Sequence, residues 1–252
     1  IHQFQALQET LSKAGYDSSL ANIDFKSIWG TRSGCQIRRV AQSKDSPQAS
    51  KEVIFKEGQK EKIKTEKENL DRWYTLFPGI APQVIDFNET NQSASLLVEF
   101  LPGCTLDEVV LTSRLEHVQN SLFILCQTLE TIWESTLKPN QIPCDFIQQT
   151  HTRLESIKLV HPEFFCSEKK LNTVNVLPLD QLLKCSAKTE KQIASPFSAL
   201  IHGDFNLNNI VYDHEAQNIR FIDLSRSRDA DYVQDISVFL ISNFRIPVFE
   251  DN

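Results

Sequence analysis

The sequence of 252 residues contains no methionine and no hydrophobic run of membrane-spanning length. Its longest apolar runs, residues 122–126 and 238–241, are far shorter than the roughly 20 residues that cross a bilayer as a helix, so we expect no membrane span. The N-terminus lacks a basic segment followed by an apolar core, and we therefore expect no secretory signal. A chain of this size with no methionine and Ile1 in first place is unusual for a complete product, so we expect some residues to be missing from it.

The chain also has no excess of basic residues. It contains 26 Lys and Arg residues and 33 Asp and Glu residues, which give a net charge of -7. This balance argues against nucleic acid as the main partner, since binding to a phosphate backbone depends on Lys and Arg. The six cysteines lie far apart, without a C-x-x-C pair or a histidine at ligand spacing, which favours free thiols in a reduced cytoplasmic protein. The P-loop motif G-x-x-x-x-G-K-[ST] is also absent.

The first hundred residues do contain a pattern of short strands and one charged helix. Five apolar runs of strand character are divided by turns and polar loops: residues 25–29, 36–40, 53–56, 84–87 and 95–100. Residues 61–76 instead carry a helical pattern that Pro78-Gly79 ends, and a shorter helix is predicted within residues 1–20, ending near Gly15. The pattern predicts a small antiparallel sheet with one main helix.

Beyond Pro102-Gly103 the pattern becomes mainly helical. Six apolar residues recur at alternating steps of three and four and share one face of a long helix: Leu115, Val118, Leu122, Leu125, Leu129 and Ile132. Helical patterns continue in 146–159, 179–183 and 233–242, with short strand-like runs at 200–201, 210–212 and 219–222. The three tryptophans, Trp29, Trp73 and Trp133, are predicted to be core or interface residues.

The strongest chemical signal is His202-Gly203-Asp204 with Asn209 and Asp223. Phosphoryl transfer from ATP needs a carboxylate near the acceptor hydroxyl and oxygen ligands for Mg²⁺ beside the phosphates. Asp204 follows an apolar strand, Asn209 comes five positions later, and Asp223 closes a second strand, so a hairpin would bring Asn209 and Asp223 together. The alternative is a turn in which these residues only cap secondary structure. Their joint spacing favours a phosphoryl-transfer site, in which His202 orders the loop.

This block, H-G-D-x-x-x-x-N followed by a strand that ends in I-D, resembles the aminoglycoside phosphotransferase and choline kinase group. The resemblance implies an α+β, bilobal protein-kinase-like fold: a small antiparallel N-terminal sheet with one helix, and a mainly helical C-terminal lobe with catalytic β-hairpins. Residues 1–101 would form the nucleotide-binding lobe, with a hinge at about 98–103, and residues 102–252 the second lobe. Asp204 would be the catalytic base, and Asn209 and Asp223 the metal ligands.

The stretch from Asp229 to Ile236 is similar to the G-D-P-x-x-D-L-A motif of the same group. By this resemblance Asp235 braces the catalytic loop. Arg228 stands where the group usually has glycine, so we assign Asp235 a structural role rather than a catalytic one.

Upstream, the single lysine of an apolar strand, Lys56, resembles the kinase lysine that contacts the α- and β-phosphates. Glu66 resembles the helix glutamate that pairs with this lysine, and Glu68 is the competing choice. Both glutamates could also belong to a solvated, charged helix face. We favour Glu66.

Two further segments complete the predicted nucleotide site. Gly30 and Gly34 lie between strand-like runs and could fold over the phosphates, although a plain β-turn explains them equally well. The run 96–103 resembles the inter-lobe hinge of the same group, in which backbone groups of Glu99 and Leu101 would bind adenine.

The function predicted from the sequence is transfer of the γ-phosphoryl group of ATP, with Mg²⁺, to a hydroxyl of a small molecule of the sugar, aminoglycoside-like or amino-alcohol class. Acidic residues between 104 and 199 could receive a cationic acceptor, but they are equally ordinary as solvated charges. One alternative is a protein kinase, against which stand Gly203 in place of arginine and only twelve positions between Asp223 and Asp235. The other is a catalytically silent nucleotide-binding module.

Arg226 and Arg228 follow Asp223 by three and five positions. A guanidinium matches phosphate oxygens in a bidentate way, so either arginine could meet a phosphate or an anionic acceptor. Salt bridges to Asp229 or Asp231 are the favoured reading.

Overall fold

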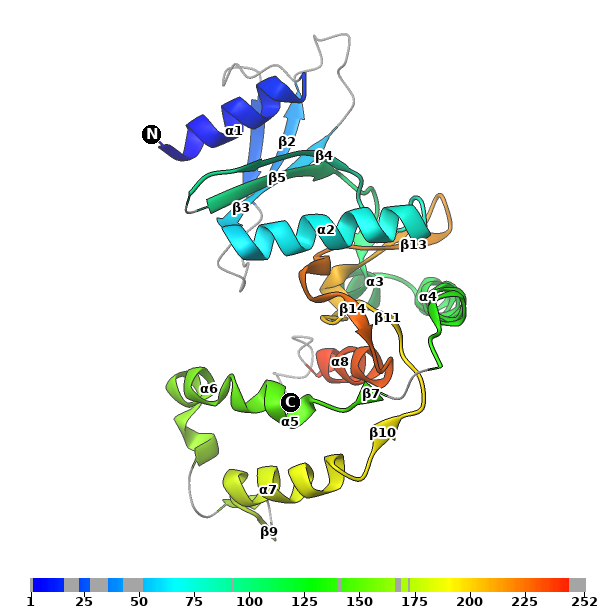
Figure 1. Cartoon of the computed structure of the whole chain (residues 1–252). Helices are drawn as coiled ribbons and strands as arrows, with labels where there is room; N and C mark the ends of the chain where they lie inside the picture. The colour runs from blue at the N-terminus through cyan, green and yellow to red at the C-terminus, as the bar shows by residue number, and fades with distance from the viewer. Residues whose placement is uncertain are drawn as a thin grey trace. The chain divides into compact units, whose positions relative to one another are not determined.

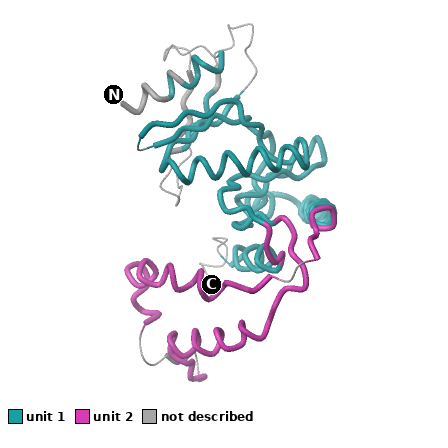
Figure 2. Tube along the Cα trace, viewed as in Figure 1, with its two compact units in different colours: residues 1–132, 201–228, 233–252 teal, residues 133–200, 229–232 magenta. Residues whose placement is uncertain are grey.

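The computed structural model describes residues 2–15, 23–27, 36–42, 52–91, 93–139, 142–165, 169–171 and 173–244 (Figure 1). The chain divides into two compact units (Figure 2). Unit 1 comprises residues 1–132, 201–228 and 233–252, and unit 2 comprises residues 133–200 and 229–232. The lobe boundary predicted at residues 101 and 102 lies inside unit 1 and stays a prediction.

Unit 1 contains a five-stranded antiparallel sheet with the strand order β1-β2-β3-β5-β4. Its strands are β1 (Ile23–Ser27), β2 (Gln36–Gln42), β3 (Val53–Gln59), β4 (Val84–Glu89) and β5 (Ser93–Glu99). The predicted N-terminal helix is α1 (His2–Lys13), whose Leu7 and Leu11 pack with Phe55 and Leu97 in a buried cluster. In the register of the central strands, Lys56 lies opposite Leu96, so the predicted lysine sits in the middle of the sheet.

Helix α2 (Lys60–Leu76) follows β3 directly and presents one buried face. That face consists of Ile63, Glu66, Leu70 and Trp73, at steps of three, four and three residues, as expected for one side of an α-helix. The helix ends at Phe77, and Gly79 in the following turn has a positive φ of 85°. A buried glutamate on an otherwise apolar face requires a partner, because an unpaired buried charge is strongly destabilising.

The remaining elements of unit 1 build the segment around His202. They are β6 (Cys104–Thr105), α3 (Leu106–Thr112), most of α4 (Leu115–Thr136), the end of β11 (Ala199–Ile201), η3 (Leu207–Asn209), β12 (Ile210–Asp213), β13 (Asn218–Phe221), η4 (Leu224–Arg226), the start of β14 (Arg228–Ala230) and α8 (Val233–Asn243). Strands β12 and β13 form an antiparallel hairpin in which Ile210 lies opposite Phe221. The helix predicted over 115–132 is confirmed as part of α4. Among the described helices, none is both long and apolar enough to cross a membrane.

Unit 2 consists of short elements. They are β7 (Ile142–Pro143), α5 (Phe146–His151), α6 (Leu154–Val160), η2 (Pro162–Phe165), β8 (Lys169–Leu171), β9 (Val174–Val176), α7 (Leu179–Glu190) and β10 (Ala194–Ser195). The helix predicted over 146–159 is interrupted at Thr152 and Arg153, which separate α5 from α6. The small β8–β9 hairpin was not predicted, because each strand has three residues and only Leu171, Val174 and Val176 are apolar.

Candidate active site

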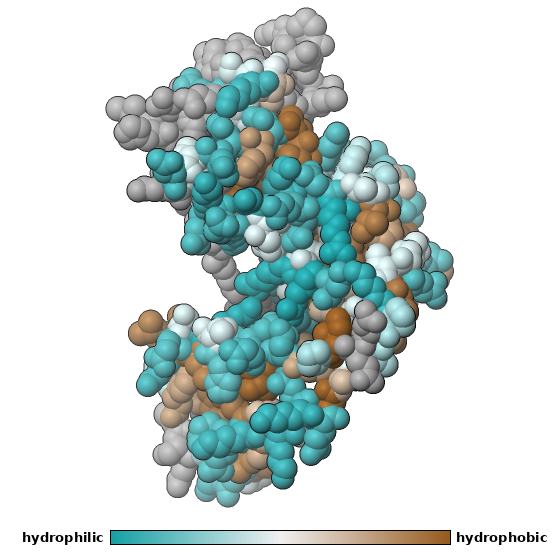
Figure 3. All heavy atoms as spheres, viewed as in Figure 1, coloured by the Kyte–Doolittle hydropathy of each residue, from teal (hydrophilic) through white to brown (hydrophobic). Residues whose placement is uncertain are grey.

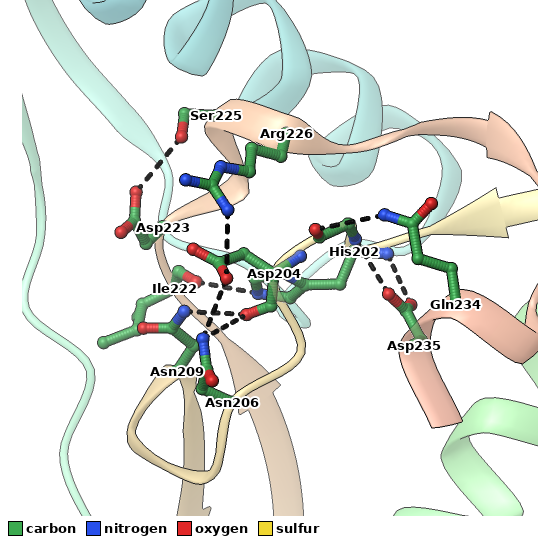
Figure 4. A network of polar contacts seen from close by, with 11 residues as sticks. His202, Asp204, Asn206, Asn209, Ile222, Asp223, Ser225, Arg226, Gln234 and Asp235 are labelled. Atoms are coloured by element: carbon green, nitrogen blue, oxygen red, sulfur yellow. Dashed lines mark hydrogen bonds and ion pairs between the residues drawn. The ribbon is translucent and has the colours of Figure 1, made fainter. Parts of the chain in front are cut away.

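The segment that starts at His202 is held by a buried carboxylate. The backbone N–H groups of His202 and Gly203 donate to the two carboxylate oxygens of Asp235, at 2.7 and 2.8 Å (Figure 4). Asp235 lies in the first turn of α8 and is 1% exposed. Its contacts fit the bracing role predicted for it, since one side chain fixes two successive peptide groups before Asp204.

The environment of Asp235 perturbs its ionisation. Burial raises the pKa of the Asp235 carboxyl above its ordinary value of 3.8, and the nearby His202 and the two N–H donors oppose this effect without cancelling it. The buried carboxylate is therefore harder to ionise in the folded chain than in the unfolded one.

The imidazole of His202 links two parts of the site. Its Nε2 lies 2.9 Å from the backbone oxygen of Ile222, and its Nδ1 lies 3.3 Å from the backbone N–H of Asp204. A carbonyl oxygen only accepts, so Nε2 donates to Ile222. Both ring nitrogens are engaged, which supports the predicted loop-ordering role and argues against a role as base.

Gly203 occupies a position that no other residue fits without a shift of the backbone. Its φ is 81°, a conformation that L side chains rarely adopt. A Cβ at this position would meet the backbone carbonyl of Arg226 at less than 3.0 Å. The glycine therefore lets the loop that carries Asp204 and the turn after Asp223 approach each other closely.

The Asp204 side chain is 26% exposed and is oriented by two neighbours. Its Oδ1 accepts a hydrogen bond from Asn206 Nδ2 at 2.8 Å and lies 3.4 Å from a guanidinium nitrogen of Arg226. No described residue donates to Oδ2. One carboxylate oxygen is thus held in place while the other is available to a substrate.

The salt bridge favoured for Arg226 differs from the one found, because Arg226 pairs with Asp204. Proximity in sequence was misleading here, since the chain turns at Asp223–Ser227 and directs Arg226 back toward the loop that carries Asp204. Arg228 donates to Gln234 Oε1 at 3.2 Å, and Asp229 pairs with Lys138 at 2.7 Å. The salt bridge favoured for Arg228 stays a prediction.

Asn209 and Asp223 lie at adjoining ends of the β12–β13 hairpin, as predicted. Asn209 donates from Nδ2 to the backbone oxygen of Asp204 at 2.8 Å, and its own backbone oxygen accepts from the Ile222 N–H at 3.0 Å. The first bond fixes the amide so that Oδ1 is the atom left for a cation. Asp223 has a left-handed backbone, φ 60° and ψ 55°, which costs about 1–2 kcal/mol for a residue with a side chain. Such conformations concentrate at functional sites.

The donors at this point suit a hard cation. The described residues contain no cluster of three or more His, Cys, Asp or Glu side chains that could hold a metal by itself. One amide oxygen and one carboxylate, completed by water and phosphate oxygens, is the kind of set that Mg²⁺ takes. Asn209 and Asp223 therefore fit Mg²⁺ bound together with a nucleotide, rather than a closed metal centre.

Lys56 and Glu66 form the predicted ion pair, with Lys56 Nζ donating to Glu66 Oε1. Lys56 is 8% exposed and Glu66 is 2% exposed. Glu68, the competing choice, lies on the exposed side of α2. The pair supplies the partner that the buried glutamate requires.

The predicted hinge can be described in part. The backbone N–H of Glu99 donates to Gln83 at 3.0 Å, and that of Phe100 donates to Glu52 at 3.2 Å. The backbone N–H of Leu101 makes no hydrogen bond within the part of the chain that the structure describes. Gly30 and Gly34, the predicted phosphate loop, lie outside the described residues.

An open depression of about 390 Å³ lies where α2 faces the η4 turn. It is lined by Glu61, Lys62, Thr65, Ser225 and Arg226. Arg226 thus contributes both to this depression and to the orientation of Asp204.

Comparison of the sequence with known proteins finds similar phosphotransferases and one matching family model. The model of the ecdysteroid kinase-like family matches residues 131–252. Aminoglycoside 3'-phosphotransferases of Escherichia coli and Salmonella typhimurium are each 27% identical over 212 residues, which is 82% of this chain and 73% of theirs.

Solved structures agree over nearly the whole chain. The aminoglycoside phosphotransferase APH(3'')-Id of Streptomyces rimosus matches with a TM-score of 0.62 and 18% identity, over 98% of this chain and 86% of that one. Its complex with ADP and streptomycin gives a TM-score of 0.64 and 17% identity, over 96% and 84%. A type VIII aminoglycoside-3'-phosphotransferase gives 0.60 and 18%, over 95% and 83%.

The chain is similar in sequence to aminoglycoside phosphotransferases and has a protein-kinase-like fold. Both the resemblance and the fold class predicted from the sequence are therefore confirmed.

In this aminoglycoside phosphotransferase-like chain, sequence reasoning missed Asn206, which orients Asp204, and two residues behind the site. The indole N–H of Trp73 donates to Ser227 Oγ at 2.7 Å, and Ser227 Oγ donates to the backbone oxygen of Ile201 at 2.6 Å. Asn206 could have been noticed because it lies inside the motif. No local signal pairs Trp73 with Ser227, which are 154 positions apart.

Proposed function

We propose that the chain is an ATP-dependent phosphotransferase that transfers the γ-phosphoryl group to a hydroxyl of a small molecule. The observation that carries this proposal is that Asp204, Asn209 and Asp223 lie close together (Figure 4). Asn209 is hydrogen-bonded both to Asp204 and to Ile222, the residue before Asp223. Two similar structures support it, since both are aminoglycoside phosphotransferases and one is a complex with ADP and streptomycin.

In the proposed reaction Asp204 accepts the proton of the acceptor hydroxyl. The hydroxyl oxygen then forms a bond to the γ-phosphorus while the bond from that phosphorus to the β,γ-bridging oxygen breaks, and ADP leaves. Asn206 and Arg226 orient the carboxylate through Oδ1, which directs Oδ2 to the acceptor. Mg²⁺, held by Asn209 and Asp223, would neutralise the charge on the phosphates.

The nucleotide contacts follow the same proposal. Lys56 binds the α- and β-phosphates and Glu66 keeps its ammonium in register. At the hinge, Glu99 and Leu101 bind adenine through backbone groups, and the unengaged N–H of Leu101 supports this role. We keep Gly30 and Gly34 as the phosphate loop, the division into lobes at residues 101 and 102, and a cytoplasmic location as predictions.

Two acceptor classes are proposed. A cationic amino sugar or amino alcohol follows from the aminoglycoside phosphotransferase relatives. A hydroxylated steroid follows from the ecdysteroid kinase-like match, which includes all of unit 2. Apolar side chains exposed in unit 2 favour the second class (Figure 3). They include Leu159, Val160, Phe164, Val174 and Leu177, between 46% and 85% exposed.

The protein-kinase alternative is weakened by two features. Gly203 leaves no room for the arginine of an H-R-D motif. Only η4 and β14 separate Asp223 from α8, so a long activation segment has no place.

The test is ADP release from MgATP with a panel of amino sugars, amino alcohols and hydroxylated steroids, run beside a protein substrate. We expect MgATP to raise the melting temperature and one small-molecule class to be phosphorylated. A well-folded sample that MgATP does not stabilise would contradict the proposal. Phosphorylation of the protein substrate alone would favour the protein kinase, and stabilisation without transfer would favour the silent module.

A further inference from the structure

One face of α2 reaches three parts of the proposed site. Glu66 on this face pairs with Lys56, and Asn69 Nδ2 donates to the backbone oxygen of Leu224 at 2.7 Å, directly after Asp223. Trp73 Nε1 donates to Ser227 Oγ at 2.7 Å at the far end of the same turn. Glu66, Asn69 and Trp73 are spaced by three and four positions and so share one face of α2. The helix therefore links Lys56 to the turn that begins at Asp223.

Ser227 continues this link to the catalytic loop. Its hydroxyl donates to the backbone oxygen of Ile201 at 2.6 Å, directly before His202. An indole N–H can only donate and a carbonyl oxygen can only accept, so the direction of both hydrogen bonds is fixed. Both bonds meet at one atom, Ser227 Oγ, and a hydroxyl oxygen is a single atom that can accept one and donate the other. A short hydroxyl side chain, Ser or Thr, suits position 227.

The two polar groups have little access to solvent. Trp73 is 1% exposed and Ser227 is 8% exposed. The indole also packs against Phe221, with ring centroids 5.7 Å apart and planes at 82°, close to the strand end that leads to Asp223. Ring packing alone would hold α2 against the strand. The directional N–H bond to Ser227 also fixes the rotation of α2 about its axis and its position along the Asp223–Ser227 turn.

We propose that Trp73 and Ser227 are positioning residues that hold α2, the Asp223–Ser227 turn and the strand before His202 in one register. The inference rests on the proposed phosphotransfer, which it deepens. The two hydrogen bonds of Ser227 thus connect the helix that holds Lys56 and Glu66 with the segments that hold Asp204, Asn209 and Asp223. Neither Trp73 nor Ser227 touches the reacting groups, so their loss affects turnover through geometry.

The test uses MgATP with water as the acceptor, because ADP release then needs no identified substrate. We compare Ser227→Ala, Ser227→Thr, Trp73→Phe and the double variant Trp73→Phe/Ser227→Ala, at saturating nucleotide and well below each melting temperature. Tyr74→Phe is the matched control, since Tyr74 is the neighbouring aromatic residue and is 39% exposed. Trp73→Phe keeps an aromatic ring and removes only the N–H donor and part of the bulk.

We expect Ser227→Ala and Trp73→Phe each to lower kcat by about tenfold, because small misplacements of reacting groups cost this much or more. KM for ATP should stay within about threefold of wild type, and the double variant should be no slower than the slower single variant, since both act through one link. Ser227→Thr should keep most of the turnover, and Tyr74→Phe all of it.

The inference is overturned if Ser227→Ala and Trp73→Phe keep the wild-type kcat, or if their effects simply add. If Ser227→Thr fails to fold, the comparison of kcat between Trp73→Phe and Tyr74→Phe still tests the inference. The variant Asp204→Asn distinguishes failure of this inference from failure of the proposed function. If wild type does not bind MgATP, or Asp204→Asn releases ADP at the wild-type rate, the proposed function fails and the inference fails with it.

Discussion

Burial differs sharply between residues 201–213, the segment that carries Asp204, and the segment that contains helices α5, α6 and α7. Ile201 and every residue of β12 are buried, and the residues between them are held by hydrogen bonds to α8 and by the ion pair of Asp204 with Arg226. In contrast, no residue of α5, α6 or α7 is buried. Chemistry needs side chains held to within a fraction of an ångström, whereas recognition of an acceptor needs surface. We infer that the reaction is encoded in the first segment and acceptor choice in the second.

The largest expected effect is that of Asp204→Asn, which tests whether chemistry resides in the buried segment. The amide cannot accept the hydroxyl proton, so we expect kcat for transfer to fall by about 10³-fold, within the range for loss of a general base. Nucleotide binding should persist, as measured by the MgATP-dependent rise in melting temperature. Asp180→Asn in α7 is the matched control, because that carboxylate is 66% exposed. Equal losses in both variants would contradict the division between the segments.

Gly203→Ala tests how closely the loop that carries Asp204 packs against the turn after Asp223. A Cβ at this position meets the backbone of Arg226, so we expect a loss of about 3 kcal/mol or more in the free energy of unfolding, together with loss of transfer. Gly79→Ala separates crowding from backbone strain, because Gly79 has a similar φ of 85° and no neighbour within 4 Å of an added Cβ. That variant should lose only about 1 kcal/mol in urea denaturation. Similar losses at the two glycines would mean that Gly203 is needed for its φ alone.

Glu66→Gln tests the nucleotide side of the same buried region. Removing the carboxylate breaks the buried ion pair of Lys56 with Glu66, so we expect a loss of about 3 kcal/mol in stability and a higher KM for ATP. Glu68→Gln, two positions along the same helix, changes an exposed side chain and should shift stability by no more than about 0.5 kcal/mol. Urea denaturation and ADP-release kinetics measure both. A larger loss for Glu68→Gln would reverse the assignment of the pair.

The sequence predicted the parts of the site that depend on local spacing. Asp204 and Asn209 lie five positions apart on one loop, and Glu66 falls on the apolar face of α2 with Ile63 and Leu70, so its burial could be anticipated. Contacts between distant segments could not. Arg226 was expected to pair with a nearby aspartate, but the η4 turn carries it to Asp204. No periodicity encodes which buried group a tryptophan N–H will reach.

The smallest expected effect concerns Asp235, whose pKa is raised by burial. The folded chain binds this proton more readily than the unfolded chain, so the carboxyl lowers stability progressively as the pH rises from 3.8 through its folded pKa. The free energy of unfolding of wild type relative to Asp235→Asn should fall across this window, by about 1.4 kcal/mol for each pH unit by which the pKa is raised. Urea denaturation at several pH values measures the slope. A wild-type advantage that grows with pH would mean that the two N–H donors outweigh the cost of burial.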